Sequence, residues 1–530
     1  MKMVKSLLLG SAAGLVAVSA GQAADLPVKA KPVEYVKVCS LYGAGFYYIP
    51  GTDVCMKIGG FLRTEWNIHA AGSFTPFENG TNAFQFRSED NFITRARAAL
   101  TADVREQTSY GTLRAYLAAG WQYSSNDAPT VSLPGTCVAT TGGGASPANC
   151  NNTNLYLLRA FIQLGGFTFG KTASFYDFFN TSKYTLQTNT LYQDFAGFGV
   201  FTYGYTQQFG NGLAFTIAAQ DPSPYERNIV DVGGAAAVGS LFALSPTNNN
   251  FQNAGTLVPD IVASLRVDQA WGGAQVAGIA HQVRARYWQA AAADETGVPA
   301  LVGVGHPGDK WGWAVMAGLE LNLQTFLPFF AKGDSFAIQG QYCVGASMDC
   351  NNNSGSRFND LAFSLINVNK IGLGWSDDGF MGNTTEIGAS GIELATNWNV
   401  VAAIQHYWVP ELRTSLYGIY QQYKANSNAV NVEVCQELNE GELPGFRGLV
   451  APTGCLDWSA WQVGSRTLWN PTRNLDVGVD VIYTTMSKTA FSGATVLIPN
   501  APGTGATGTF TAADTHIWSG ILRVQYNFLP

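Results

Sequence analysis

Apolar and polar residues alternate along many short segments of this chain, from residue 56 almost to the last residue. Successive side chains of a β-strand point to opposite faces, so this period of two predicts strands with one apolar and one polar face. On this pattern we predict sixteen strands: 56–68, 90–105, 110–123, 153–165, 166–173, 197–209, 211–221, 259–270, 273–287, 310–323, 334–345, 394–408, 411–424, 457–470, 474–487 and 514–528.

The segments that join these strands alternate between long and short. The short joins are turn-like, as at Gly165-Gly166 and Gly210-Asn211-Gly212, whereas the long joins are rich in Gly, Asn, Ser and Thr. Bacterial outer-membrane barrels have an even number of antiparallel strands, with short turns at one rim and long loops at the other. The pattern therefore predicts an all-β fold: a sixteen-stranded transmembrane antiparallel β-barrel in the cell outer membrane.

The alternation also assigns side chains to the two faces of each strand. In 56–68, Leu62 and Trp66 fall on the apolar track, which would face lipid, and Glu65 falls on the lumen track. In 153–165 the same rule turns Tyr156 and Leu158 outward. A secreted β-sandwich or adhesin would alternate too. The apolar tracks have about the ten residues that a tilted strand needs to cross a bilayer, which favours the barrel.

The first residues resemble a secretory signal peptide. Lys2 and Lys5 are followed by the apolar run Leu7–Ala20, and cleavage is expected after Ala23. We therefore divide the chain into a signal peptide (1–23), a periplasmic N-terminal segment (24–55) and a barrel (56–530). The apolar run is too short to span a membrane as a helix.

Composition supports a barrel in lipid. Only 13% of residues are charged against 46% hydrophobic, whereas soluble proteins carry about 25% charged residues. One face of each barrel strand meets lipid, where a charge costs a few kcal/mol. The net charge of −7 includes no basic excess, so no nucleic-acid partner is expected.

The eight cysteines fall into pairs that are local in the sequence. An exported chain meets an oxidising compartment, so we predict four disulfides: Cys39–Cys55, Cys137–Cys150, Cys343–Cys350 and Cys435–Cys455. No Cys-x-x-Cys occurs and the five histidines are scattered, so we expect no metal and no cofactor.

Three stretches of the chain are similar to the general porin family of alphaproteobacterial outer membranes. They are the opening, from Val33-Glu34-Tyr35-Val36-Lys37-Val38-Cys39 to Ile49-Pro50-Gly51-Thr52-Asp53-Val54-Cys55; the run Ala160-Phe161-Ile162-Gln163-Leu164-Gly165-Gly166-Phe167; and the close, Arg523-Val524-Gln525-Tyr526-Asn527-Phe528. The opening is the most specific of the three, because many barrels share an aromatic-terminated last strand.

The resemblance implies several properties. A family member would form a sixteen-stranded barrel, assemble as a homotrimer in outer-membrane lipid, and let small hydrophilic solutes diffuse passively, with one loop folded into the lumen. Leu529 and Pro530 depart from the aromatic last residue that is usual in the family, and we expect them to affect recognition by the assembly machinery. The outer loops 221–258 and 346–393 are long enough to cap part of the mouth.

Charged residues on the lumen tracks are the candidate site. A pore selects by its diameter and by the charge at its narrowest part. We predict a basic wall on four adjacent strands, made of Arg63, Arg95, Arg97, Arg114 and Arg159. The facing surface would be the third outer loop, roughly 173–197, with Asp177, Lys183 and Asp194. The sign of the ion preference stays open.

Two other functions stay open at this point. A ligand-specific channel would show a continuous aromatic track in the lumen, of which the sequence gives only Phe61 and Tyr116. A barrel enzyme would need a triad assembled from distant strands, and no Gly-x-Ser-x-Gly, Walker or zincin motif with the required context is present. We therefore expect a diffusion channel and not an enzyme.

Overall fold

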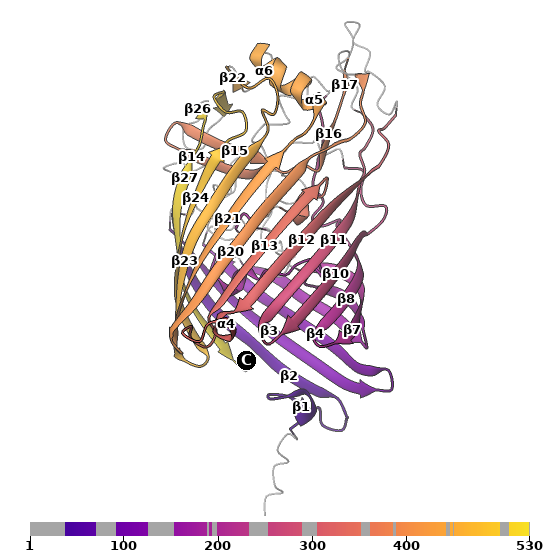
Figure 1. Ribbon diagram of the computed structural model, residues 1–530, viewed down its shortest axis with the longest axis vertical. Helices are drawn as coiled ribbons and strands as arrows, with labels where there is room; N and C mark the ends of the chain where they lie inside the picture. The colour runs from indigo at the N-terminus through magenta and orange to yellow at the C-terminus, as the bar shows by residue number, and fades with distance from the viewer. Residues whose placement is uncertain are drawn as a thin grey trace, which may run out of the picture. The chain divides into compact units, whose positions relative to one another are not determined.

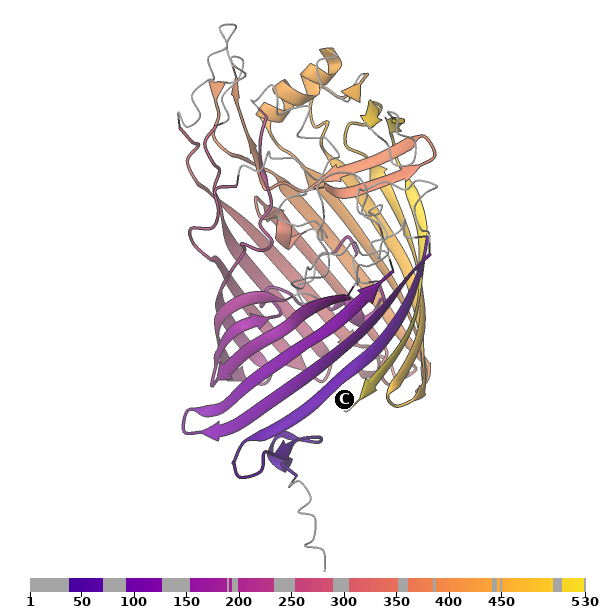
Figure 2. The ribbon, with the colours of Figure 1, turned by 180° about the vertical axis from the view of Figure 1, so that it is seen from behind.

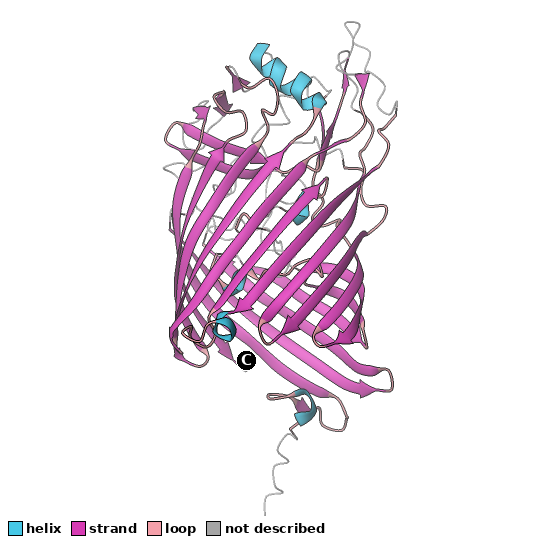
Figure 3. Ribbon diagram, viewed as in Figure 1, coloured by secondary structure: helices cyan, strands magenta, loops and turns pink. Residues whose placement is uncertain are grey.

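The computed structural model describes residues 38–69, 92–125, 153–187, 190–192, 199–232, 253–288, 305–350, 361–384, 388–440, 446–448, 450–498 and 508–528. Strands dominate these residues and the helices are short (Figure 3). Within them, no helix has the length and apolar character needed to cross a membrane. The chain divides after Lys57 into two compact units.

The first unit is a small disulfide-linked hairpin. It contains the 3-10 helix η1 (Ser40–Tyr42) and the strand β1 (Tyr47–Tyr48), which pairs with the start of β2 (Cys55–Ile68). The predicted disulfide Cys39–Cys55 is present, and both cysteines are buried against Phe46.

The second unit is a closed antiparallel barrel. Within the described residues sixteen strands form it, and β27 pairs with β2 from Gly60↔Phe528 to Ile68↔Gly520 to close the ring. The strands are β2, β3 (Phe92–Thr108), β4 (Gly111–Ser124), β5 (Thr153–Leu164), β6 (Phe167–Thr172), β7 (Val200–Gly210), β8 (Leu213–Gln220), β10 (Asp260–Gln269), β11 (Gly272–Val283), β12 (Lys310–Asn322), β13 (Ser335–Val344), β20 (Thr396–Val409), β21 (Leu412–Lys424), β23 (Trp458–Thr472), β24 (Leu475–Lys488) and β27 (His516–Phe528).

The predicted barrel is confirmed, and the strand ends lie within four residues of their expected positions. The largest difference is at 273–287, because β11 ends at Val283. Its partner β12 begins opposite, at Lys310, so the hydrogen-bonded ladder stops there.

The predicted faces hold for most strands, and one prediction is wrong. Leu62 and Trp66 of β2 are exposed on the outer face and Glu65 is buried. In β5, however, Leu155 and Leu157 are the exposed residues, not Tyr156 and Leu158. The β4–β5 register passes from Ala118↔Arg159 to Ala119↔Leu157, so Leu158 is an extra, bulged residue. A bulge inserts one residue and reverses the alternation beyond it.

The two rims of the barrel differ as expected. Short turns join the strands at the lower rim in Figure 1, and the long connections extend from the upper rim. The same arrangement is seen from behind, where β2 to β5 cross the front of the view (Figure 2). One lower turn carries a helical segment, α4 (Leu323–Phe326).

The outer connections also fold into a layer of their own, which we call the cap. Its sheets contain β9 (Ile229–Asp231), β14 (Leu361–Asn367), β15 (Lys370–Trp375), β16 (Gly379–Met381), β17 (Asn383–Thr384), β18 (Gly388–Ala389), β19 (Glu393–Leu394), β22 (Phe446–Arg447), β25 (Thr495–Ile498) and β26 (Gly508–Ala512). Its helical segments are η4 (Ser347–Asp349), α5 (Asn428–Val430), η5 (Asn431–Gln436) and α6 (Glu437–Glu440).

An apolar core holds the cap together. Phe363, Trp375, Phe380, Trp458 and Phe491 are all buried in one cluster that joins five outer connections, the third outer loop among them. The predicted disulfide Cys435–Cys455 belongs to the same cluster. The long outer loops are therefore folded, which their Gly- and Asn-rich composition did not predict.

Candidate functional site

The third outer loop, between β6 and β7, folds into the lumen. Its described part includes the 3-10 turn η3 (Thr181–Lys183). Inside a barrel this loop has no ladder to satisfy its backbone, and buried N–H and C=O groups must be paired. Side-chain amides of the barrel wall provide the partners: the N–H of Phe179 donates to Gln339 Oε1 and the N–H of Leu191 to Gln462 Oε1, each at 2.8 Å.

The same loop is bound at both ends of this wall. Near its start, Gln275 of β11 donates to the carbonyls of Phe175 and Tyr176 at 3.1 and 3.0 Å. Farther along, Asp480 of β24 accepts from Thr185 Oγ1 and from the N–H of Leu186, both at 2.6 Å. We call the surface formed by Gln220, Gln275, Gln339, Gln405 and Gln462 the amide wall.

Small wall residues let the loop approach closely. A Cβ on Gly318 of β12 would lie 2.4 Å from the ring of Phe178, and one on Gly478 of β24 would lie 3.0 Å from Leu186. The loop residue Tyr176 is buried, and burial raises the pKa of its hydroxyl well above its usual value, so it is neutral. The loop therefore packs along one side of the lumen as a fixed layer.

A second turn also folds inward, next to this loop. The predicted disulfide Cys343–Cys350 closes it, and the carbonyl of Cys350 accepts from Asn399 and Gln421, which belong to the inner face of β20 and β21. Cys343 and Cys350 lie in one buried apolar cluster with Tyr176. The turn therefore packs against Tyr176 near the start of the third outer loop.

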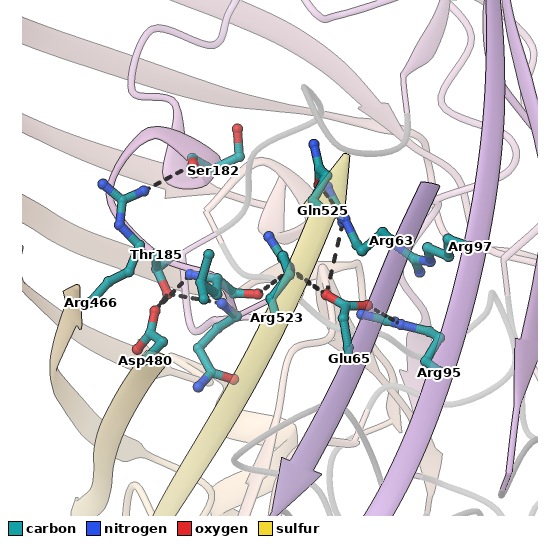
Figure 4. A network of polar contacts seen from close by, with 12 residues as sticks. Arg63, Glu65, Arg95, Arg97, Ser182, Thr185, Arg466, Asp480, Arg523 and Gln525 are labelled. Atoms are coloured by element: carbon teal, nitrogen blue, oxygen red, sulfur yellow. Dashed lines mark hydrogen bonds and ion pairs between the residues drawn. The ribbon is translucent and has the colours of Figure 1, made fainter. Parts of the chain in front are cut away.

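On the other side of the lumen, four arginines surround one glutamate. Glu65 of β2 accepts from Arg95 Nε of β3 at 2.6 Å and from Arg523 Nε of β27 at 2.7 Å (Figure 4). Arg63 Nη1 lies 3.9 Å from Glu65, and Arg97 lies beside Arg63 in Figure 4. We call Arg63, Arg95, Arg97 and Arg523 with Glu65 the arginine cluster. Three of the five residues predicted for the basic wall lie in it.

The other two predicted arginines lie apart from the cluster. Arg114 forms a two-point ion pair with Asp103, with Nε and Nη2 each 2.9 Å from a carboxylate oxygen. Arg159 donates from Nη1 to the carbonyl of Leu158 at 2.6 Å, in the bulge of β5. The wall is thus a cluster at β2, β3 and β27 with two outlying cations on β4 and β5.

The residues predicted on the loop are also separated. Asp177 lies where the loop begins, and its carbonyl accepts from Gln275 of β11. Lys183 forms an ion pair with Glu320 of β12 and so faces the amide side. Asp194 lies outside the described residues, as do Cys137 and Cys150.

The sequence did not predict the contact between Arg523 and Glu65, which depends on closure of the barrel. Arg523 and Glu65 were both assigned to the lumen face, but they are 458 residues apart and meet only because β27 pairs with β2. Arg523 also donates to the carbonyl of Leu186 at 2.5 Å, which connects the cluster to the third outer loop. Among the residues that the structure describes, no group of His, Cys, Asp or Glu is arranged to hold a metal ion.

The fold and the lumen define a class of protein: a closed sixteen-stranded barrel with an apolar outer face and a pore narrowed by an inward loop is an outer-membrane channel. The chain belongs to the porin subfamily, whose family model matches residues 25–521.

Relatives agree with this assignment. The chain is 28% identical over 337 residues to Porin Omp2b of Brucella melitensis biotype 1, which covers 60% of this chain and 80% of that protein. It is 30% identical over 281 residues to Porin Omp2b of Brucella suis, with 52% and 65% covered. The outer membrane channel DcaP of Acinetobacter baumannii shares the fold, with a TM-score of 0.53 and 12% identity over 91% of this chain and 99% of that one.

Family and fold together establish the function at the level of the class. The chain is an outer-membrane porin that forms a channel for passive diffusion. The predicted location in the cell outer membrane is confirmed.

Proposed function

We propose that the passage between the arginine cluster and the third outer loop is the constriction of this porin, and that small hydrophilic solutes and ions cross it through water. One observation carries the proposal: the loop is bound along the lumen wall from Gln275 of β11 through Asp480 of β24 to Arg523 of β27, so it narrows the lumen along that part of the wall. The arginines border the side that remains.

Opposed polar surfaces at a narrow point would discriminate against apolar molecules, which lose hydration there without gaining polar contacts. Low-dielectric walls concentrate the electric field across such a gap. The basic wall Arg63, Arg95, Arg97, Arg114 and Arg159 and the loop residues Asp177, Lys183 and Asp194 are the residues we propose to act on solutes. We propose no catalytic role for the chain, in keeping with its family of channels.

We further propose that the porin is a homotrimer. The outer face of β3 to β7 has a shallow apolar groove of about 560 Å³, because small residues such as Ala102, Ala115 and Ala160 lie there among larger ones. A neighbouring barrel can pack into such a groove. Ala115→Trp should weaken the trimer in cross-linking and gel assays, whereas Leu416→Trp, at an exposed position on the outer face of β21, should not.

Conductance in planar bilayers tests the channel itself. Purified, folded protein should form open channels whose conductance rises in proportion to salt concentration, without added ligand. Folded protein that gives no conductance would contradict the proposal. Saturation of the flux of one solute at low concentration would instead favour the ligand-specific channel.

A further inference from the structure

The arginine cluster has more positive charge than it needs to hold itself together. Glu65 accepts one hydrogen bond from Arg95 at 2.6 Å and one from Arg523 at 2.7 Å, and Arg523 Nη2 forms an ion pair with it at 2.5 Å. Among the residues that the structure describes, four guanidinium groups face this one carboxylate, which gives these five side chains a net charge of three positive units. Guanidinium groups do not lose their protons in proteins, so the excess persists at any physiological pH. A single carboxylate facing the cluster from the loop would not cancel it.

Two of these arginines are held in the same unusual way. Arg63 donates from Nε to Oε1 of Gln525 at 2.6 Å, and Arg97 donates from Nε to Oε1 of Gln122 at 2.5 Å. In each case a glutamine on a neighbouring strand fixes the inner edge of the guanidinium. The four Nη atoms are not used by these bonds. Neither side chain is fully buried.

Carboxylates bind Arg63 and Arg97 weakly or not at all. Arg63 is 3.9 Å from Glu65, which is beyond hydrogen-bond distance. Across the described residues, Arg97 has no carboxylate partner, and its other contact is with the ring of Tyr156. They lie on the adjacent strands β2 and β3, and their side chains lie beside each other (Figure 4). Such paired donors match the oxygens of a carboxylate or phosphate.

We propose that Arg63 and Arg97 form a transient binding site for small oxyanions, and that the pore prefers anions to cations. This inference rests on the proposed constriction and adds the class of solute that it favours. Because the third outer loop fills the amide side, a solute must pass close to the cluster. Glu65 is a positioning residue, which fixes Arg95 and Arg523 behind the site.

Reversal potentials in a potassium chloride gradient test the preference. Wild-type channels should be several-fold more permeable to chloride than to potassium. Inorganic phosphate, added at constant ionic strength, should reduce the chloride current. The double variant Arg63→Gln/Arg97→Gln should lose most of the anion preference and the phosphate effect. Arg473→Gln removes the same charge from an exposed turn between β23 and β24 and should behave as wild type.

The double variant Arg63→Lys/Arg97→Lys separates charge from geometry. Lysine keeps the charge but not the planar pair of donors, so the anion preference should remain and the phosphate effect should weaken. An undiminished phosphate effect in the lysine variant would overturn the two-point site. Open wild-type channels that prefer potassium would overturn the inference and leave the proposed function standing, whereas folded protein without conductance would overturn the proposed function itself. Heat-modifiable migration on gels verifies that each variant is folded.

Discussion

The two sides of the lumen use different polar groups for different tasks. On β11, β13 and β23 inward-facing glutamines bind the backbone of the third outer loop, and the buried Arg466 of β23 donates to Gln405 and to the carbonyl of Ser182. On β2, β3 and β27 the inward positions carry arginines, which share one glutamate. An amide can both donate and accept, so it can pair with either backbone group. A guanidinium can only donate and keeps its charge, so it suits a surface that meets solutes.

The two sides also differ in whether their polar side chains are accessible to a solute. The amide wall is covered by the loop, and residues such as Gln339 and Gln462 are fully buried. In the arginine cluster Arg63 retains 18% of its side-chain exposure.

The largest effect is expected where the loop is tied to the amide side. Asp480→Ala removes the acceptor of Thr185 Oγ1 and of the Leu186 N–H, and a buried donor without a partner costs about 1–3 kcal/mol. The loop should then leave the wall and intermittently enter the passage. Single-channel recordings should show frequent partial closures.

A matched control lies on the same strand. Asp476 accepts from Asn470 and Asn527 and does not contact the loop in any described interaction. Asp476→Ala should therefore conduct steadily. If Asp480→Ala is as steady as wild type, the loop does not depend on this tether.

The next effect concerns the arginine side. Replacing Arg95, Arg97 and Arg114 together by Gln should shift the reversal potential toward cations. Arg97 should contribute most, because Arg95 is paired with Glu65 and Arg114 with Asp103. The Debye length falls from about 10 Å at 0.1 M salt to about 3 Å at 1 M, so the shift should be larger at low salt. An ion preference unchanged at low salt would place the selective charges elsewhere.

These two sides were predictable from the sequence to different degrees. Alternation predicted that Arg63 and Arg95 face the lumen. It could not say that Glu65 meets Arg523, because that contact arises only when the last strand pairs with the first. It also failed from Leu158 back to the start of β5, since a bulge leaves no mark in the period-two pattern. The run of inward amides on the later strands was the available sign of a bound loop.

The cap was the largest feature that local patterns did not predict. Its strands are short, and they pair between connections that are distant in sequence, as in the parallel contact of β15 with β26. Its apolar residues are spread over four connections and form a core only when these meet. Such non-local pairing gives no continuous alternation within any one segment.

A smaller effect is expected from the disulfide turn that supports the loop. Cys343→Ser/Cys350→Ser opens a short covalent loop, which in the chain-entropy model contributes about 2–3 kcal/mol. The variant should unfold at a lower temperature in a heat-modifiability assay, and its channels should be noisier because Tyr176 loses a neighbour. Cys39→Ser/Cys55→Ser, in the small N-terminal hairpin, removes a disulfide from a different buried cluster and should leave the current noise unchanged.

The smallest effect should come from pH, through Asp349 in the same turn. Burial and the nearby carboxylate of Asp260 raise the pKa of the Asp349 carboxyl well above its usual value; Asp378 acts in the same direction, and His281 and Arg227 oppose it. The folded protein thus keeps a proton that the unfolded chain releases above about pH 4. The contribution of Asp349 to the free energy of unfolding is therefore greatest below about pH 4. It decreases as the pH rises to the pKa of Asp349 in the folded protein.

Wild type should accordingly unfold at a lower temperature at pH 8 than at pH 5. Asp349→Asn cannot ionise, so the difference between the two pH values should shrink, while the solvent-exposed Asp309→Asn should keep the wild-type difference. Because Asp349 lies on the turn that contacts Tyr176 of the loop, a change in its charge acts on the amide side of the lumen alone. The ion preference of the open channel, which depends on the arginine side, should therefore be the same in Asp349→Asn as in wild type; a shift would show that the two sides are coupled.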